Sequence, residues 1–129
     1  IFSPGIPQVY YAGLFAAEND MALLAKTNVG RDINRPYLDE KAVSESLEKP
    51  VVKALIALIR LRNSLAALAG EFSVTQHENI LLLNWQAEQS TAQLTVDFAS
   101  LMASVTYTEE GLERHVDVSV DGLAQSMTA

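Results

Sequence analysis

The spacing of the apolar residues changes at Gly70, and this change limits what the chain can fold into more than any other feature of the sequence. Before Gly70, apolar residues recur three or four positions apart, as on one face of an amphipathic helix; they are Val51, Val52, Leu55, Leu58, Ile59 and Leu65. Pro50 suits the first turn of a helix, and Gly70 suits its end. The pattern therefore predicts a helix over about residues 49–68.

After Gly70 the period changes to two, which is typical of half-buried β-strands. We expect strands at residues 72–75, 80–85, 91–98, 104–107 and 115–120. Turn-forming residues separate or follow them, at positions 77–79, 88–90, 109–111 and 121–122. Five short strands at this spacing suit an antiparallel sheet or sandwich. The chain is thus expected to divide near Ala69 and Gly70 into a mainly helical part, residues 1–69, and a small β-domain, residues 70–129.

The segment Gln8–Ala12 is short, aromatic and apolar apart from Gln8, which favours a fully buried parallel strand. Such a strand needs a neighbour on each edge, and the rest of the chain does not obviously supply them. In residues 14–49, Asn19–Met21 is expected to start a helical turn, and Asp39 to cap a short helix through Glu45. Irregular connections longer than ~12–15 residues are usually functional or disordered, and we interpret this one as functional.

Charge is distributed unevenly along the chain. Residues 1–70 contain eight Lys and Arg against seven Asp and Glu, whereas residues 71–129 contain only Arg114 against nine acids. Nucleic acids and anionic membranes both need a basic surface, so neither is an expected partner. The sequence contains no Cys, which excludes disulfides and thiolate zinc sites and fits a reducing compartment. We expect a soluble, cytoplasmic protein.

Two segments of the first half resemble a known family. Residues 4–7 (Pro-Gly-Ile-Pro), which lead into Tyr-Tyr-Ala-Gly at residues 10–13, are similar to the approach and eighth barrel strand of the α-amylase-like glycosidases. Residues 18–35, and above all Gly-Arg-Asp-Ile-Asn-Arg at residues 30–35, closely resemble the sucrose phosphorylase group within that clan. The likeness continues through residues 50–63. It is strong over about the first 65 residues and general beyond them.

The resemblance implies an α+β chain, namely the last strand, loop and helix of a (β/α)8 barrel followed by a small antiparallel β-domain. It also implies a retaining phosphorylase, in which a carboxylate displaces fructose or another aglycone and phosphate then takes the sugar as glucose 1-phosphate. The two carboxyl groups of such a reaction lie about 5–5.5 Å apart, and in the family they come from middle strands of the barrel. No catalytic residue is therefore expected in this chain, and the chain alone is expected to be inactive.

One family residue carries over to a numbered position. Arg31 matches the arginine that in relatives helps to hold the glucosyl unit, a role that suits a guanidinium with five donors in a fixed fork. A loop that follows a barrel strand lies at the catalytic face. Asp32, Asn34 and Arg35 are expected to support the shape of this loop.

Other candidate residues favour simpler interpretations. Tyr10 and Tyr11 favour barrel packing over sugar stacking, and Trp85 favours core packing over carbohydrate binding. His77 and His115 lie far apart in the sequence without a third ligand at a familiar spacing. We expect neither a metal nor a cofactor.

Several alternatives stay open at this stage. The glucoside is sucrose, sucrose 6-phosphate, glucosylglycerol or glucosylglycerate, with phosphate as the second substrate of the intact enzyme. A hydrolase or transglucosidase of the same clan fits the same residues, and residues 71–129 would also fit a non-catalytic carbohydrate-binding or interaction module. Exposed barrel surface on an isolated chain is expected to drive homo-oligomer formation.

Overall fold

The computed structural model describes residues 1–126, and the chain divides into two compact units. Unit 1 contains residues 1–7 and the chain from Ala57 onward, and unit 2 contains residues 8–56. The predicted division near residue 70 separates the helical sequence from the sheet. The boundaries of the compact units differ from this division, because the first seven residues and the end of the long helix belong to the same unit as the sheet.

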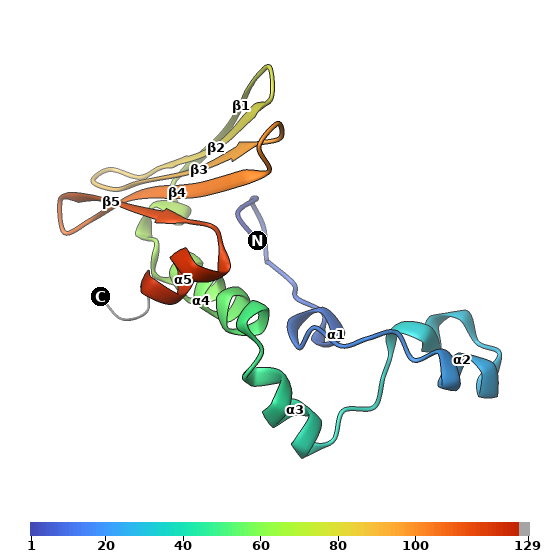
Figure 1. Ribbon diagram of the computed structural model, residues 1–129. Coiled ribbons are helices and arrows are strands. Elements are labelled where there is room, and N and C mark those ends of the chain that lie inside the picture. Colours follow the sequence, from blue (N-terminus) through green and yellow to red (C-terminus); the bar gives the residue numbers. More distant parts are fainter. Residues whose placement is uncertain (127–129) are drawn as a thin grey trace. The chain divides into compact units, whose positions relative to one another are not determined.

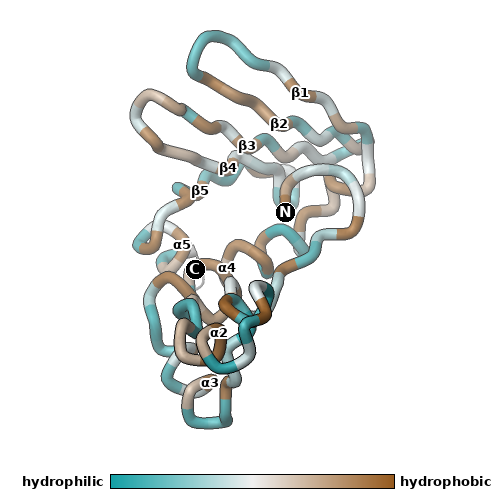
Figure 2. Tube along the Cα trace, turned by 90° about the vertical axis from the view of Figure 1, so that its right-hand side faces the viewer, coloured by the Kyte–Doolittle hydropathy of each residue, from teal (hydrophilic) through white to brown (hydrophobic). Residues whose placement is uncertain are grey.

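Unit 1 is built on a five-stranded antiparallel sheet in which each strand pairs with the next one in the chain (Figure 1). The strands are β1 (Glu71–His77), β2 (Ile80–Gln86), β3 (Thr91–Asp97), β4 (Met102–Glu109) and β5 (Leu112–Asp117). Hydrophobic and hydrophilic residues alternate along much of the sheet (Figure 2), whereas β2 begins with four apolar residues in a row. The prediction of five antiparallel strands is confirmed, and they form one sheet rather than a sandwich.

The register of the sheet gathers most of its large apolar residues on one face; Ile80, Leu82 and Met102 lie on the other. Trp85 lies opposite Phe72 on one side and Ala92 on the other, and Ala92 lies opposite Tyr107. Two positions further along the sheet, Leu83, Leu94, Val105 and Val116 form a second row. Side chains of a strand alternate between the two faces, so both rows share a face and the polar residues between them lie on the other.

Turn geometry fixes this register at the hairpins. Glu110 and Gly111, between β4 and β5, have φ values of 51° and 77°. Two consecutive residues with positive φ are the signature of a type I′ turn, whose twist matches that of the flanking strands. The predicted turn at residues 109–111 is therefore confirmed.

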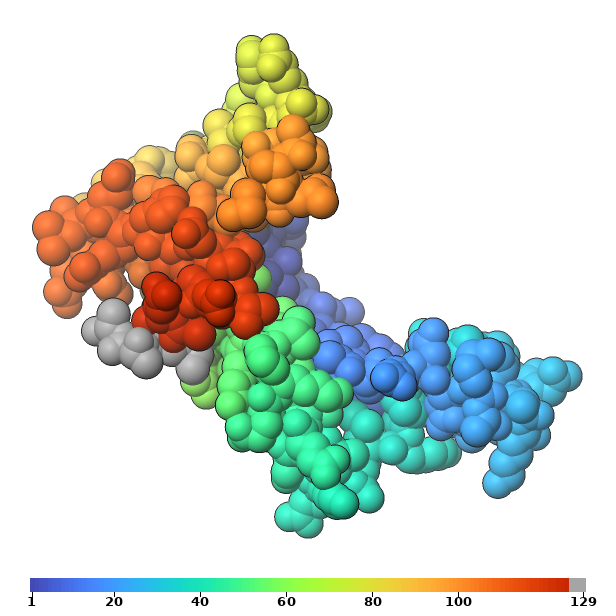
Figure 3. Space-filling model, in the orientation of Figure 1, coloured from blue at the N-terminus to red at the C-terminus, as the bar shows by residue number. Residues whose placement is uncertain are grey.

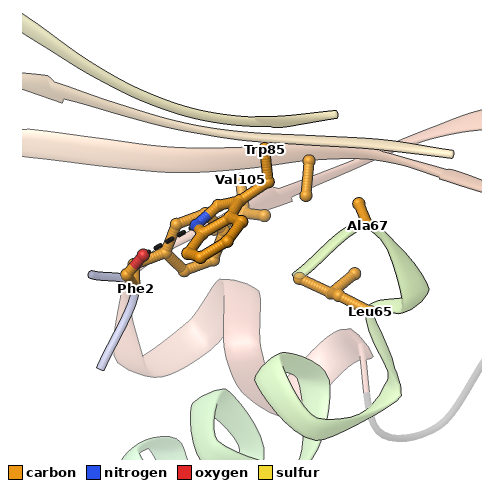
Figure 4. Packing of buried hydrophobic residues seen from close by; sticks show 6 residues of the cluster. Phe2, Leu65, Ala67, Trp85 and Val105 are labelled. Carbon is orange, nitrogen blue, oxygen red and sulfur yellow. Dashed lines mark hydrogen bonds between the residues drawn. The ribbon is translucent and has the colours of Figure 1, made fainter. Parts of the chain in front are cut away.

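The core of unit 1 lies against the apolar face of the sheet (Figure 4). Its buried members are Phe2, Leu65, Ala67, Trp85, Ala92 and Val105. Burial of a side chain such as Val105 stabilises the fold by about 1.5–3 kcal/mol. The 3-10 helix η2 (Ala66–Ala69) contacts β2 and β3, and α5 (Val120–Ser126) contacts β5, beside which it lies at the surface (Figure 3).

Unit 2 is a series of short helices: α1 (Tyr11–Leu14), α2 (Met21–Thr27), the 3-10 helix η1 (Gly30–Asn34) and α3 (Glu40–Leu47). Helix α4 (Pro50–Ser64) begins in unit 2 and ends in unit 1. The side chains of Asp20 and Asp39 accept hydrogen bonds from the third backbone amide after each, at 2.7 and 2.8 Å. Both predicted helix starts are confirmed, because N-cap carboxylates satisfy amides that lack a partner in the first turn.

The predicted strand at residues 8–12 is wrong. Residues 11–14 form the helical turn α1, in which Leu14 N–H donates to the Tyr10 carbonyl and Phe15 N–H to the Tyr11 carbonyl. The five strands of the sheet pair only with one another, so residues 8–12 have no ladder to join. A buried strand without neighbours leaves backbone groups unpaired, and a helical turn satisfies some of them locally.

Two element ends also differ from prediction. The fifth strand stops at Asp117, and the predicted turn at residues 121–122 lies inside α5, where Ser119 Oγ accepts from the Gly122 amide at 3.0 Å. The predicted helix over residues 49–68 ends at Ser64, whose hydroxyl donates to the Leu61 carbonyl at 2.8 Å. In both places a serine hydroxyl competes with the regular backbone pattern.

Within residues 1–126, no helix combines the length and apolar character that crossing a membrane requires.

Gly70 is required where η2 turns into β1. A Cβ at this position would overlap the carbonyl oxygen of Gln86, a backbone atom that cannot rotate away. We expect Gly70→Ala to lower the free energy of unfolding by about 1–3 kcal/mol, as overpacking does, when measured by chemical denaturation. Gly13→Ala is the control, because a Cβ at Gly13 meets open space. Equal stability of the two variants would contradict this account.

Asp97 holds the turn between β3 and β4. Its carboxylate accepts from the Ser100 hydroxyl at 2.7 Å and from the Ala99 amide at 2.8 Å, and these bonds lower the pKa of Asp97 below its ordinary value. A lowered pKa contributes stability that is present above the ordinary value of ~3.9 and is lost as the pH falls through the folded value. Asp97→Ala should therefore be less stable than the parent near neutral pH, and the difference should shrink below about pH 4.

Denaturation midpoints measured between neutral and acid pH check this expectation. Glu88→Ala, which removes an exposed acid from the preceding turn, should leave the same pH profile as the parent. A difference for Asp97→Ala that persists unchanged into acid would show that ionisation of this carboxyl does not matter.

Candidate functional site

The candidate site is the arginine loop, which we define as residues 28–36 of unit 2. It begins with Asn28, a left-handed residue (φ 53°) whose amide donates to the Leu24 carbonyl and ends α2. The turn η1 follows and carries Arg31. The amide of Asp20 donates to the Ile33 carbonyl at 2.7 Å, which ties the start of α2 to this turn. Backbone hydrogen bonds thus hold Arg31 on a short, closed turn.

Arg31 lies at the surface of unit 2. Within the part of the chain that the structure describes, no hydrogen bond or ion pair engages its guanidinium. A guanidinium carries five donors and does not lose its charge in proteins. Arg31 can therefore offer its full set of donors to an oxygen-rich ligand or to a carboxylate.

The other predicted residues lie beside Arg31. Asp32 is half-buried, and Asn34 and Arg35 are exposed. The hydrogen bonds here are made by the backbone: the Asp32 amide donates to the Val29 carbonyl, and the Arg35 amide donates to the Asp32 carbonyl. The structure brings all four residues together, and the support it shows for the loop comes from the main chain.

Tyr11 supports the far end of the loop, a role that sequence reasoning missed. Its hydroxyl donates to the Pro36 carbonyl at 3.0 Å, and its ring packs on that of Tyr10 with centroids 4.8 Å apart. The pKa of Tyr11 is raised, mainly because its hydroxyl has less contact with water and secondarily because of the neighbouring Tyr10 hydroxyl. The charge of Arg35 opposes this shift. The hydrogen bond from Tyr11 to Pro36 is therefore the side-chain contact that supports this end of the loop.

Lys49 has a structural role that its sequence position does not reveal. Its ammonium donates to the carbonyls of Phe15 and Ala16, at 3.3 and 3.0 Å, just after α1. A cation at the end of a helix satisfies carbonyls that lack amide partners. Because Lys49 directly precedes α4, these two bonds join the segment after α1 to the start of α4.

An open hollow of about 520 Å³ lies next to the loop but does not include Arg31. Residues 17–22, Pro36 and Leu38, and four residues from Ala42 to Lys49 line it, with three carboxylates and one ammonium among them. This lining has no feature that selects one ligand.

The remaining candidates from the sequence lie in unit 1. Trp85 is only 8% exposed and its indole N–H is bonded within the core, which confirms the packing interpretation. His115 contacts Thr106 and Asp117, each at 3.2 Å, on the polar face of the sheet, and His77 is exposed at the end of β1. Among residues 1–126, no cluster of three or more His, Cys, Asp or Glu side chains has the arrangement of a metal site.

Comparison with known proteins decides the family. No family model matches the chain. The sucrose phosphorylase of Bifidobacterium adolescentis is 50% identical over 97 residues, which cover 74% of this chain and 19% of the relative. That of Agrobacterium vitis is 48% identical over 106 residues, covering 81% of this chain and 22% of the relative. The chain belongs to the sucrose phosphorylase family.

A solved structure supports the assignment. The sucrose 6F-phosphate phosphorylase of Thermoanaerobacter thermosaccharolyticum matches with a TM-score of 0.84 at 39% identity, over 88% of this chain and 24% of that one. The chain spans about a fifth of the length of the curated sucrose phosphorylases it matches and corresponds to their C-terminal part. The resemblance found in residues 4–35 is confirmed, and the five-stranded sheet is the fold that this part of a sucrose phosphorylase adopts.

The N-cap of α2 gives a test of how the arginine loop is held. Asp20→Ala removes the acceptor for the Leu23 amide, and loss of an N-cap costs about 0.5–2 kcal/mol. We expect faster amide hydrogen exchange across Met21–Thr27, measured by NMR or mass spectrometry. Glu18→Ala removes the same charge from an exposed neighbouring position and should leave the exchange unchanged. Equal protection in the two variants would show that the cap does not stabilise α2.

Proposed function

We propose that this chain is the C-terminal part of a phosphorylase that transfers glucose from an α-glucoside to phosphate, with sucrose as the first candidate donor. The observation that supports this most strongly is identity of 48–50% to sucrose phosphorylases over 74–81% of the chain. The solved relative acts, by its name, on sucrose 6F-phosphate. The choice of aglycone is therefore the least determined part of the proposal.

The proposed chemistry is retaining and uses two carboxyl groups. One attacks the anomeric carbon and releases the aglycone, which the other protonates; phosphate then displaces the first carboxylate and leaves as glucose 1-phosphate. Both groups belong to parts of the barrel outside this chain. Residues 1–69 contribute the loop and helix that complete the barrel, and residues 70–129 form the domain that follows it.

Arg31 binds the glucosyl unit in this proposal. It lies on a turn tied at both ends by backbone hydrogen bonds, and no partner within the described chain occupies its donors. A fork of N–H donors can bind sugar hydroxyls and at the same time orient a neighbouring carboxylate. Asp32, Asn34 and Arg35 support the shape of this loop in the proposal.

The non-catalytic alternative requires the β-domain to bind carbohydrate through Trp85. Trp85 is buried and its N–H is engaged, so its ring is not free to stack on a sugar. The partners we propose are therefore the α-glucoside and phosphate in the intact protein, which we place in the cytoplasm and expect to self-associate.

Arg31→Lys tests the proposed binding residue. Lysine keeps the charge but loses the planar fork, so kcat/KM for the glucosyl donor should fall about tenfold or more in the intact enzyme. Arg60→Lys makes the same chemical change at an exposed position on α4 and should stay within about twofold of the parent. Equal kcat/KM in the two variants would remove Arg31 from the site.

Phosphorolysis by the intact protein tests the reaction itself. Sucrose, sucrose 6-phosphate, glucosylglycerol and glucosylglycerate are offered separately with phosphate, and glucose 1-phosphate is measured. Product from one donor supports the proposal and names the substrate. Glucose released without any dependence on phosphate would identify a hydrolase, and no turnover of any donor would leave the proposal without support.

A further inference from the structure

Unit 1 contains an open hollow of about 530 Å³ that includes none of the residues assigned to the proposed reaction. Ligand pockets usually measure about 300–1,000 Å³. Residues of β4, β5 and α5 line the hollow, and all of them belong to unit 1. The side chains on which the following argument depends are those of Tyr107, Glu109, Arg114, Val116 and Asp117. We call this site the β-domain hollow.

Helix α5 supplies one wall of the hollow, because it approaches the end of β5 closely (Figure 1). Gly122 allows this approach, since a Cβ at that position would overlap the carbonyl oxygen of Asp117. Leu123 is only 3% exposed, which holds the helix against the rest of unit 1. Gly122 and Gln125 therefore line the hollow opposite the strand residues.

The polar groups of the hollow come from neighbouring strands. Tyr107 lies opposite Arg114, and Glu109 lies two positions after Tyr107, on the same face of the sheet. Arg114 Nε lies 3.5 Å from a carboxylate oxygen of Glu109, and both side chains are about half exposed. Within residues 1–126, no hydrogen bond engages the Tyr107 hydroxyl or the terminal nitrogens of Arg114. These groups can therefore bind a ligand without losing a buried partner.

Tyr107 keeps its proton at neutral pH. Burial, and after it the charge of Glu109, raises the pKa of Tyr107 above its ordinary value, while Arg114 opposes the shift. A protonated phenol both donates and accepts hydrogen bonds, a guanidinium only donates, and an ionised carboxylate only accepts. The hollow thus offers donors and acceptors side by side.

This set of groups suits neighbouring hydroxyls better than it suits an ion. A hydroxyl donates and accepts, so adjacent hydroxyls of one molecule can use Arg114 and Glu109 at the same time. A phosphate only accepts, and it would meet the carboxylates of Glu109 and Asp117 beside a single guanidinium. A cation would leave the donors of Arg114 unused, close to a like charge.

The charge of the surrounding domain also disfavours anions. Arg114 is the only Lys or Arg among residues 71–129, which contain nine acids, and a field of one sign repels ligands of the same sign. An apolar surface is available as well: Tyr107 packs partly against the core, and Val116 is 8% exposed. An aromatic ring presents an apolar face to the C–H groups of a sugar while its hydroxyl stays free to bond.

We propose that the β-domain hollow binds a neutral sugar, as a free mono- or disaccharide. Arg114 and Glu109 bind neighbouring hydroxyls of the sugar, and Tyr107 contributes its ring and its hydroxyl. The site contains no residue of the arginine loop, so this inference does not depend on the proposed function of Arg31.

Methyl NMR of the intact protein with 13C-labelled valine tests the proposal. Val116→Ile identifies the Val116 signals. Glucose, fructose and sucrose are titrated separately without phosphate, and inorganic phosphate alone is the anionic probe. We expect at least one sugar to shift the Val116 signals in a saturable way, and Arg114→Met to raise the Kd of that sugar about tenfold or more. The variant should fold, because exposed ion pairs contribute little to stability.

Arg60→Met is the matched control. It makes the same exchange at an exposed position of α4 that does not line the hollow, and it should leave the Kd within about twofold of the parent. Tyr107→Phe gives a second test, because it removes a hydroxyl that has no partner within residues 1–126. We expect it to raise the Kd about threefold or more.

Three results would overturn the proposal: no shift of the Val116 signals with any sugar, an equal Kd for the parent and Arg114→Met, or tighter binding of phosphate than of every sugar. A Kd that Arg114→Met raises and Arg60→Met leaves unchanged supports it. Because the signals report on Val116, either result is distinct from success or failure of the phosphorolysis experiment.

Discussion

The hydrogen bond between the Trp85 indole and the Phe2 carbonyl organises unit 1. A buried N–H without an acceptor is costly, and this one finds its acceptor 83 positions earlier in the chain. The bond places the Phe2 ring among Leu65, Ala67 and Val105, so Phe2 becomes part of the core of the sheet, while its neighbours in residues 1–7 stay exposed. The β-domain is therefore completed by a segment that a division at residue 70 assigns to the other part of the chain.

Unit 2 is stabilised in a different way. Its residues contribute few side chains to the buried set, chiefly Ala12 and Ser46 in the stretch before α4. Its shape rests on hydrogen bonds that close single turns: the caps of Asp20 and Asp39, the left-handed Asn28, and the ties made by Tyr11 and Lys49. Segments with few buried apolar contacts open at low free energy. This combination gives the arginine loop a defined backbone with few buried side chains beneath it.

Membership of the sucrose phosphorylase family connects the arginine loop with the proposed reaction. In the proposed reaction the arginine loop brings a charged fork to a glucosyl unit, and the carboxylates that react lie elsewhere in the intact protein. A binding residue contributes through its orientation, because small displacements of a hydrogen-bonding group weaken transition-state contacts strongly.

The local features of this protein follow from the sequence by itself: the amphipathic stripe of α4, the alternation of five strands, the positive-φ turn at Glu110 and Gly111, and the N-caps at Asp20 and Asp39. Each depends on residues within one or two turns of one another, and the Gly-Arg-Asp-Ile-Asn-Arg motif likewise revealed the family locally. The tertiary structure alone decided that residues 8–12 join no sheet, that Ser119 starts a helix where a strand end was expected, and that Trp85 bonds Phe2. Partners so distant in the chain leave no periodic signal in the sequence, because a donor's acceptor is chosen by the packing of the whole unit rather than by its neighbours.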